Sequence, residues 1–155
     1  MYKAGTWQGK VADYGIDETK AGDPQVFVLF DVDMDGDIKQ LTWHGYLKSD
    51  KSQEITFKAL QVLGHMGKVT ALIDGPDSGC IAIGTSAQLV CEEEEYELKK
   101  FVKIKWVNMP GQTMQVHRAE PNAAKAKLLK LGIDGNMAKF NAVNPAPVRP
   151  PDVPF

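Results

Sequence analysis

A single helical stripe set among segments of strand periodicity constrains the fold most. Alternation with a period of two, and short apolar runs rich in branched and aromatic side chains, are typical of β-strands. Residues 50–67 differ, because their apolar side chains recur at the spacing of an amphipathic helix. The sequence therefore predicts five strands, with one helix between the third and the fourth. The predicted strands cover residues 7–14, 26–30, 38–47, 88–97 and 99–107.

The predicted helix has a signal at each end. Asp50 with Gln53 predicts an N-terminal cap, and Gly64 or Gly67 predicts the stop. The apolar stripe that would face the core consists of Ile55, Ala59, Val62, Leu63 and Met66.

This order of elements is the layout of the oligonucleotide/oligosaccharide-binding (OB) fold, so we expect a mainly β protein built on a five-stranded OB-fold barrel. Asp35-Gly36 predicts the hairpin turn between the second and third strands, because a tight hairpin needs positive φ at both central residues. A split sandwich or an SH3-like barrel with an inserted helix fits less well. Residues 68–82 are compatible with helix, strand or loop.

Three regions are predicted along the chain. Residues 1–118 carry the pattern of the barrel, and 119–140 form a helical extension in which Pro121 begins a helix and Gly132 ends it. Residues 141–155 are rich in proline, which suits neither helix nor sheet. We therefore expect a flexible, disordered tail at the C-terminus.

The net charge of -2 hides a strong asymmetry along the chain. Residues 1–97 hold 8 lysines and 17 acidic residues, whereas residues 98–149 hold 10 basic and 2 acidic residues. Such asymmetry indicates a surface that meets a polyanion or a polycation.

The last predicted strand combines positive charge with an aromatic ring. Alternation places Lys99, Phe101, Lys103 and Lys105 on one face, while Val102, Ile104 and Trp106 point to the core. Single-stranded nucleic acid needs aromatic rings for its bases and cations for its phosphates, and this face offers both. The alternative is a solvated lysine face with Phe101 buried at the end of the barrel. The predicted nucleic-acid-binding residues are Trp43, Tyr46, Lys99, Phe101, Lys103, Lys105, Lys125 and Lys127, with Lys130 as an additional cation.

The acidic run Glu92–Glu95, followed by Glu97, precedes this lysine strand. If the two strands pair, cross-strand Glu–Lys pairs form and use up positive charge. Alternatively, the glutamates form an edge that repels DNA, or one that mimics DNA for a protein partner.

Motifs for metal binding and catalysis are incomplete. Asp31, Asp33, Asp35 and Gly36 match the start of a calcium loop, but its twelfth position is Thr42, where a glutamate is needed. The histidines His44, His65 and His117 have no ligand spacing. We therefore expect no metal, no cofactor and no enzymatic activity, and reduced thiols at Cys80 and Cys91.

The chain ends in Asp152-Val153-Pro154-Phe155 after a proline-rich stretch. This ending resembles the C-terminal tip of bacterial single-stranded DNA-binding proteins, which is a docking peptide for replication and repair enzymes. The resemblance implies that Phe155 enters an apolar pocket of a partner and that its carboxylate meets a basic residue. The family has several acids before its tip, whereas only Asp152 is present here, which weakens electrostatic steering.

A second resemblance covers about residues 1–115. It runs from a Tyr-x-x-Gly start to Trp106-Val107-Asn108-Met109-Pro110-Gly111, and is similar to a family of phage-encoded proteins presumed to bind single-stranded DNA. This similarity implies a role in DNA replication, recombination or repair.

We therefore expect a non-catalytic protein that binds single-stranded DNA without strong sequence preference and recruits partner enzymes through its tip. No apolar run is long enough for a membrane span, and no secretory signal is present, so we expect a cytoplasmic protein of a bacterium or a phage-infected cell. The sequence leaves open whether it acts as a monomer or as a homo-oligomer. The main alternative is an OB-fold protein-interaction module that uses the acidic half and binds no nucleic acid. A metal-dependent enzyme built on the aspartates of residues 31–37 is the weakest alternative.

Overall fold

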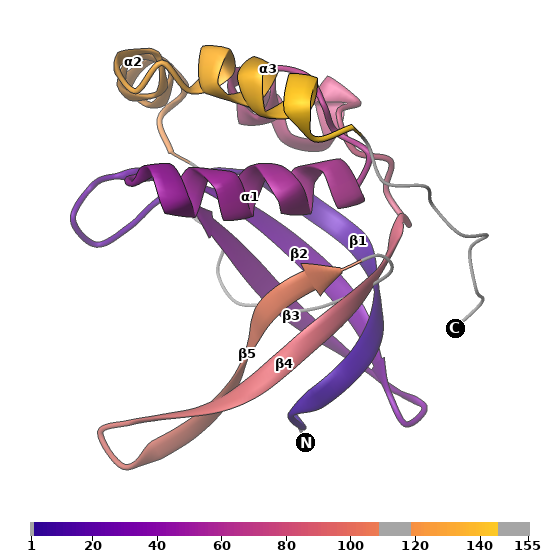
Figure 1. The fold of residues 1–155 in the computed structure, drawn as a ribbon. Helices are drawn as coiled ribbons and strands as arrows, with labels where there is room; N and C mark the ends of the chain where they lie inside the picture. The colour runs from indigo at the N-terminus through magenta and orange to yellow at the C-terminus, as the bar shows by residue number, and fades with distance from the viewer. Residues whose placement is uncertain (1, 109–118, 146–155) are drawn as a thin grey trace.

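The computed structural model describes residues 2–108 and 119–145. Within these ranges the chain forms a mixed α/β fold, in which one antiparallel sheet packs against helices (Figure 1). The strands are β1 (Gly5–Glu18), β2 (Pro24–Met34), β3 (Asp37–Tyr46), β4 (Ser86–Tyr96) and β5 (Lys99–Asn108). The helices are α1 (Asp50–Val62), the 3-10 segment η1 (Val69–Ser78), α2 (Pro121–Lys130) and α3 (Ile133–Val143).

The five predicted strands and the helix between β3 and β4 are confirmed. The sheet has the order β3-β2-β1-β4-β5, and all neighbours are antiparallel. The closed barrel is wrong, because no hydrogen-bonded ladder joins β3 to β5 in the described ranges. The boundary between β3 and β5 is therefore an open seam. Trp43 of β3 and both Trp106 and Val107 of β5 line a pocket there.

The predicted hairpin turn at Asp35-Gly36 is also confirmed. Asp35 has φ 56° and Gly36 has φ 87°, so both central residues adopt the left-handed conformation that a two-residue turn requires. The Asp33 carboxylate accepts a hydrogen bond from the Gly36 amide at 2.7 Å. The aspartates of this segment therefore belong to a strand end and its turn.

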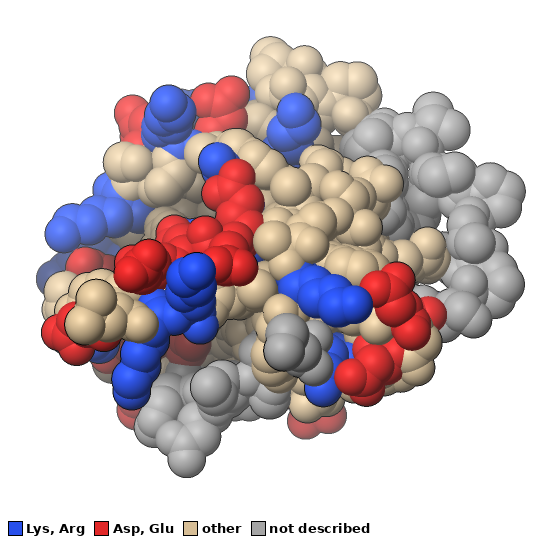
Figure 2. Space-filling view, turned by 90° about the horizontal axis from the view of Figure 1, so that it is seen from below, with Lys and Arg blue, Asp and Glu red and all other residues tan. Residues whose placement is uncertain are grey.

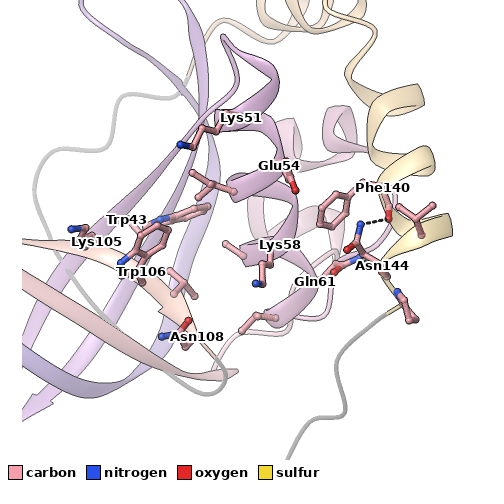
Figure 3. A pocket seen from close by; sticks show the side chains of 16 residues that line it. Trp43, Lys51, Glu54, Lys58, Gln61, Lys105, Trp106, Asn108, Phe140 and Asn144 are labelled. Carbon is pink, nitrogen blue, oxygen red and sulfur yellow. Dashed lines mark hydrogen bonds between the residues drawn. The ribbon is translucent and has the colours of Figure 1, made fainter.

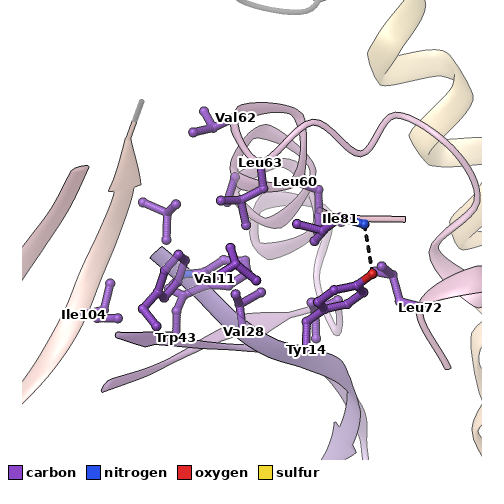
Figure 4. Packing of buried hydrophobic residues seen from close by; sticks show 14 of the residues in the cluster. Val11, Tyr14, Val28, Trp43, Leu60, Val62, Leu63, Leu72, Ile81 and Ile104 are labelled. Atoms are coloured by element: carbon purple, nitrogen blue, oxygen red, sulfur yellow. Dashed lines mark hydrogen bonds between the residues drawn. The ribbon is translucent and has the colours of Figure 1, made fainter. Parts of the chain in front are cut away.

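The core lies between the sheet and the helices, and the inward residues of every strand contribute to it (Figure 4). Tyr14 is fully buried, and its hydroxyl accepts a hydrogen bond from the Ile81 amide at 3.0 Å, which ties β1 to the segment after η1. The ambiguous residues 68–82 are thus mainly 3-10 turns packed on the sheet. Other fully buried side chains include Phe30, Leu47, Leu60, Leu72, Leu89 and Leu128.

Helix α1 differs in detail from the prediction. Its N-cap is Ser49, whose side chain accepts from the Ser52 amide, whereas Asp50 lies inside the helix. Ile55 and Met66 were expected in the core but are exposed by 38% and 37%. The buried face is rotated toward Thr56, Phe57 and Leu60, which leaves Ile55 on the side of α1 that lines the pocket.

The C-terminal region contains two helices where one was predicted. Helix α2 begins at Pro121 as expected, but Gly132, with φ 60°, is followed at once by α3. Helix α3 continues to Val143, so the first residues of the predicted tail are helical. The Asp134 carboxylate accepts from the Val69 amide at 2.7 Å and from the Thr70 hydroxyl at 2.9 Å. The buried residues of α2 and α3 therefore belong to the same core as the sheet, and the tip Asp152–Phe155 lies outside the described residues.

None of the helices in the described ranges combines the length and the apolar character that crossing a membrane requires.

Substitution of Gly45 is expected to destabilise the fold. A Cβ at this position would lie 2.6 Å from Trp43 Cη2 and 2.7 Å from Thr56 Cγ2, because α1 packs closely on β3 there. Gly45→Ala should lower the free energy of unfolding by about 1–3 kcal/mol, measured by urea denaturation. The control is Gly135→Ala inside α3, where a Cβ would meet none of the described residues within 4 Å. It should stabilise the protein by about 0.5–1 kcal/mol, and equal effects of the two variants would contradict this packing.

Acid is expected to destabilise the protein through His65. This side chain is buried, its Nε2 lies 3.0 Å from the Lys68 carbonyl oxygen, and burial lowers its pKa below the ordinary value of 6.5. The unfolded chain therefore binds a proton first, so the contribution is complete above about pH 6.5 and is lost as the pH falls below it. Urea unfolding between about pH 7.5 and about pH 5.5 should show a weaker pH dependence for His65→Gln than for the wild type. An unchanged pH dependence in His65→Gln would refute this role.

Candidate nucleic-acid interface

The outer face of β5 carries the first part of the candidate interface. Lys99, Phe101 and Lys103 share this face, while Ile104 is buried on the other side, as the alternation predicts. Phe101 is exposed by 45%, so its ring is available at the surface. The alternative prediction, a buried Phe101 at the end of the barrel, is therefore wrong.

A β-bulge changes the second half of β5. Cys91 pairs with Ile104 and Val90 pairs with Trp106, so Lys105 has no partner in the ladder. The extra residue shifts the alternation by one position. Trp106, which was predicted to lie in the core, is consequently 43% exposed, and Val107 is buried in its place.

Cross-strand ion pairs join β4 to β5, as one of the sequence interpretations predicts. Lys105 Nζ lies 3.1 Å from Glu92 Oε1, Lys103 pairs with Glu94, and Lys100 Nζ lies 3.7 Å from Glu93 Oε1. These side chains are about half exposed. Figure 2 shows lysines and acids side by side over the face seen there. Much of the positive charge of β5 is thus already neutralised within the protein.

A pocket of about 770 Å³ continues from the bulge of β5 to α1 and the end of α3 (Figure 3). Trp43 and Phe140 form apolar parts of its wall, and Trp106 lines it from the edge strand. Lysines from two elements lie around these rings. The lining residues are Trp43, Lys51, Glu54, Ile55, Lys58, Ala59, Gln61, Val62, Lys105, Trp106, Val107, Asn108, Phe140, Val143, Asn144 and Pro145.

The wall formed by α3 is fixed by hydrogen bonds to α1. Gln61 donates to the Asn141 side chain at 2.7 Å and to the Asn144 carbonyl at 2.8 Å. The ring of Phe140 packs edge-on against Phe57, with 5.8 Å between the ring centroids. The pocket is therefore shaped by side chains that tertiary contacts hold in place.

Lys51 and Lys58 were missed by the sequence reasoning. They lie on α1 with Ile55 and Val62 at the spacing i, i+4, i+7 and i+11, so one side of the helix presents two lysines and two apolar residues. That spacing is the feature of the sequence from which these two lysines could have been identified. Its meaning depends on which strand lies beside the helix, and the sequence does not state that.

The other predicted binding residues are not all brought together. Trp43 is only 4% exposed, so it forms a wall of the pocket and offers no open surface for stacking. Tyr46 is 56% exposed but lies on the outer face of β3, opposite in direction to Trp43. Lys127 of α2 donates to the Gly22 carbonyl, and neither it nor Lys125 lines the pocket.

Within the described ranges, no three or more of His, Cys, Asp and Glu are grouped so that they could hold a metal ion. His44 lies 3.7 Å from the Asp17 carboxylate, far along the sequence from the buried His65. Both cysteines are free thiols, and burial raises the pKa of the Cys91 thiol to about 11. A thiol of that pKa is a poor nucleophile at neutral pH.

No protein-family model matches the chain, and no curated protein matches it. The geometry of the pocket and of β5 therefore provides the basis for assigning a function.

Proposed function

We propose that the protein binds single-stranded DNA along a track that runs over the outer face of β5 and into the pocket beside α1. The observation that carries this proposal is the position of Trp106. Its ring is 43% exposed at a pocket that Lys51, Lys58 and Lys105 also line. An accessible indole among ammonium groups is what an unpaired base and its phosphates require.

The chemistry of binding divides between rings and cations. A base stacks on Trp106 and a second base on Phe101, each stacking contact contributing about 1–3 kcal/mol. Phosphates lie near Lys51 and Lys58 on α1 and near the lysines of β5. A base must be free of its pairing partner to present its face, so the track favours single strands over duplex.

The strand order supports a fold of the OB type. An OB fold is a five-stranded, partly open Greek-key barrel with a characteristic oligonucleotide-binding surface. The order β3-β2-β1-β4-β5, with α1 between β3 and β4, fits such a barrel opened between β3 and β5. Proteins of this class combine a basic groove with stacking rings.

The biological role proposed with this activity is protection of single-stranded DNA during replication, recombination or repair in the cytoplasm of a bacterium or a phage-infected cell. The protein acts without catalysis. Recruitment of partner enzymes through Asp152, Val153, Pro154 and Phe155 rests on the resemblance of this ending to bacterial single-stranded DNA-binding proteins. Tyr46, Lys99, Lys125 and Lys127 remain additional contacts that a longer strand could reach.

A protein-interaction module is the second candidate, and the tip of the β4–β5 hairpin favours it. Tyr96 is 66% exposed and Leu98 is 93% exposed, next to the glutamates of β4. Apolar side chains in such a position suit a protein partner. Under this alternative, charge reversal at Lys103 and Lys105 leaves the function intact, whereas changes at Glu92–Glu95 abolish it.

The proposal predicts tight, salt-sensitive binding of oligo-dT that depends on Trp106. Fluorescence anisotropy of labelled oligo-dT should show that Trp106→Ala weakens binding by about 5- to 100-fold, because a stacking contact is lost. Lys58→Gln should weaken binding and reduce the dependence of affinity on salt, because fewer counterions are released.

The matched control is Lys20→Gln, which removes the same charge from an exposed lysine in the connection between β1 and β2. It should bind like the wild type. Absence of binding by the wild type at low salt would overturn the proposed function, and equal losses in Lys20→Gln and Lys58→Gln would overturn the assignment of the track. Unaltered binding in Trp106→Ala would remove the stacking role.

A further inference from the structure

The β4–β5 hairpin separates its four consecutive glutamates onto two faces. Glu92 is directly opposite Lys103 and Glu94 is directly opposite Phe101, so these two carboxylates lie on the outer face that carries the track. Glu93 and Glu95 are opposite Val102 and Lys100 and point to the other face. Neighbouring residues of identical chemistry therefore have different surroundings.

The two outer-face glutamates already hold the lysines that would bind phosphate. Lys105 Nζ is 3.1 Å from Glu92 Oε1, and Lys103 is paired with Glu94. A phosphate that approaches either ammonium group meets a carboxylate in the same place. Binding must therefore exchange one anion for another.

We propose that Glu92 and Glu94 are built-in competitors of the DNA phosphates, which occupy Lys105 and Lys103 until the strand displaces them and thereby set the affinity. This inference rests on the proposed function. It assigns to the outer-face glutamates a role distinct from those of Glu93 and Glu95.

The exposure of these pairs makes the exchange feasible. All four side chains are between 41% and 48% exposed, and ion pairs in such surroundings are weak. Displacement of one pair therefore reduces the affinity by only about twofold to fivefold. The glutamates lower the affinity without blocking the track.

The lysines of α1 provide the first contact. Among the described residues, neither Lys51 nor Lys58 has a carboxylate within ion-pair distance, although Glu54 lines the same pocket. Phosphates can meet these ammonium groups without displacing an ion pair. The strand then exchanges with Glu92 and Glu94 as it extends along β5.

The displacement of Glu92 and Glu94 by phosphates also changes how steeply the affinity for DNA depends on salt concentration. Each phosphate that a lysine neutralises releases a counterion from the DNA, but a carboxylate freed in the same step attracts a cation back. The net ion release is then smaller than the number of lysines on the track suggests. Removal of the outer-face carboxylates should raise the affinity and steepen its dependence on salt.

Two double variants with the same change of net charge test the inference. Glu92→Gln/Glu94→Gln alters the outer face, and Glu93→Gln/Glu95→Gln alters the opposite face of the same strand. Anisotropy titrations with labelled oligo-dT at two salt concentrations should show about 4- to 20-fold tighter binding for the outer-face variant. The opposite-face variant should change the affinity by less than about threefold.

The outcomes separate this inference from the proposed function. If the wild type binds oligo-dT but both double variants tighten binding equally, a general charge effect is at work and the inference is overturned. It is likewise overturned if neither variant tightens binding. If none of the three proteins binds at low salt, the proposed function itself fails.

A double-mutant cycle distinguishes competition by the glutamates from a loss of the hairpin structure. Lys103→Gln should weaken binding more in the Glu94→Gln background than in the wild type, because the lysine is then free for phosphate. Equal effects in both backgrounds would contradict the competition. Circular dichroism of each variant establishes that the sheet is retained.

Discussion

Among the described residues no hydrogen-bonded ladder joins β3 to β5, and the candidate interface depends on this open seam. A paired seam would place the two strands about 5 Å apart and leave no space for a ligand between them. Because the seam is unpaired, side chains from both strands and from α1 line a pocket there. The free edge of β5 also needs protection from pairing with other chains, and lysines along an edge strand provide it. The same lysines can thus serve solubility and ligand binding.

The local pairing of charged side chains determines the electrostatics of this surface more than the net charge of the segment does. The chain concentrates its basic residues after residue 97, yet three lysines of β5 are matched by glutamates of β4. A hairpin with one acidic and one basic strand stabilises its own ladder, with each pair contributing about 0.2–1 kcal/mol. Two-stranded ribbons are marginal when they extend past a sheet, and β1 accompanies β4 only as far as Cys91. The ion pairs therefore help the projecting part of the hairpin to keep its shape.

Local patterns predicted much of the fold, and tertiary contacts explain where the prediction failed. Alternation and the Asp35-Gly36 turn sufficed for the strands and their first hairpin because their causes lie within a few residues. Alternation predicts that Trp106 faces the core, which is wrong because the β-bulge shifts the pattern by one residue. The bulge cannot be recognised from the residues of β5 alone. Whether β3 pairs with β5, and whether Lys58 lines the same pocket as β5, depends on elements more than 40 residues apart in the sequence. Gly132 has the conformation of a helix end, but whether a new helix follows is decided by packing such as that of Met137.

The hydrogen bonds from Gln61 to the end of α3 have a consequence for the part of the chain that follows. They hold Asn144 beside α1, so the polypeptide leaves the described fold at Pro145, on the wall of the pocket. Residues 146–155 can span at most about 35 Å, the length of ten fully extended residues. Under the proposed function, an enzyme that bound Phe155 would therefore be tethered near a DNA strand bound at Trp106. The length of the linker, and not the abundance of that enzyme in the cell, would then set its local concentration at the strand.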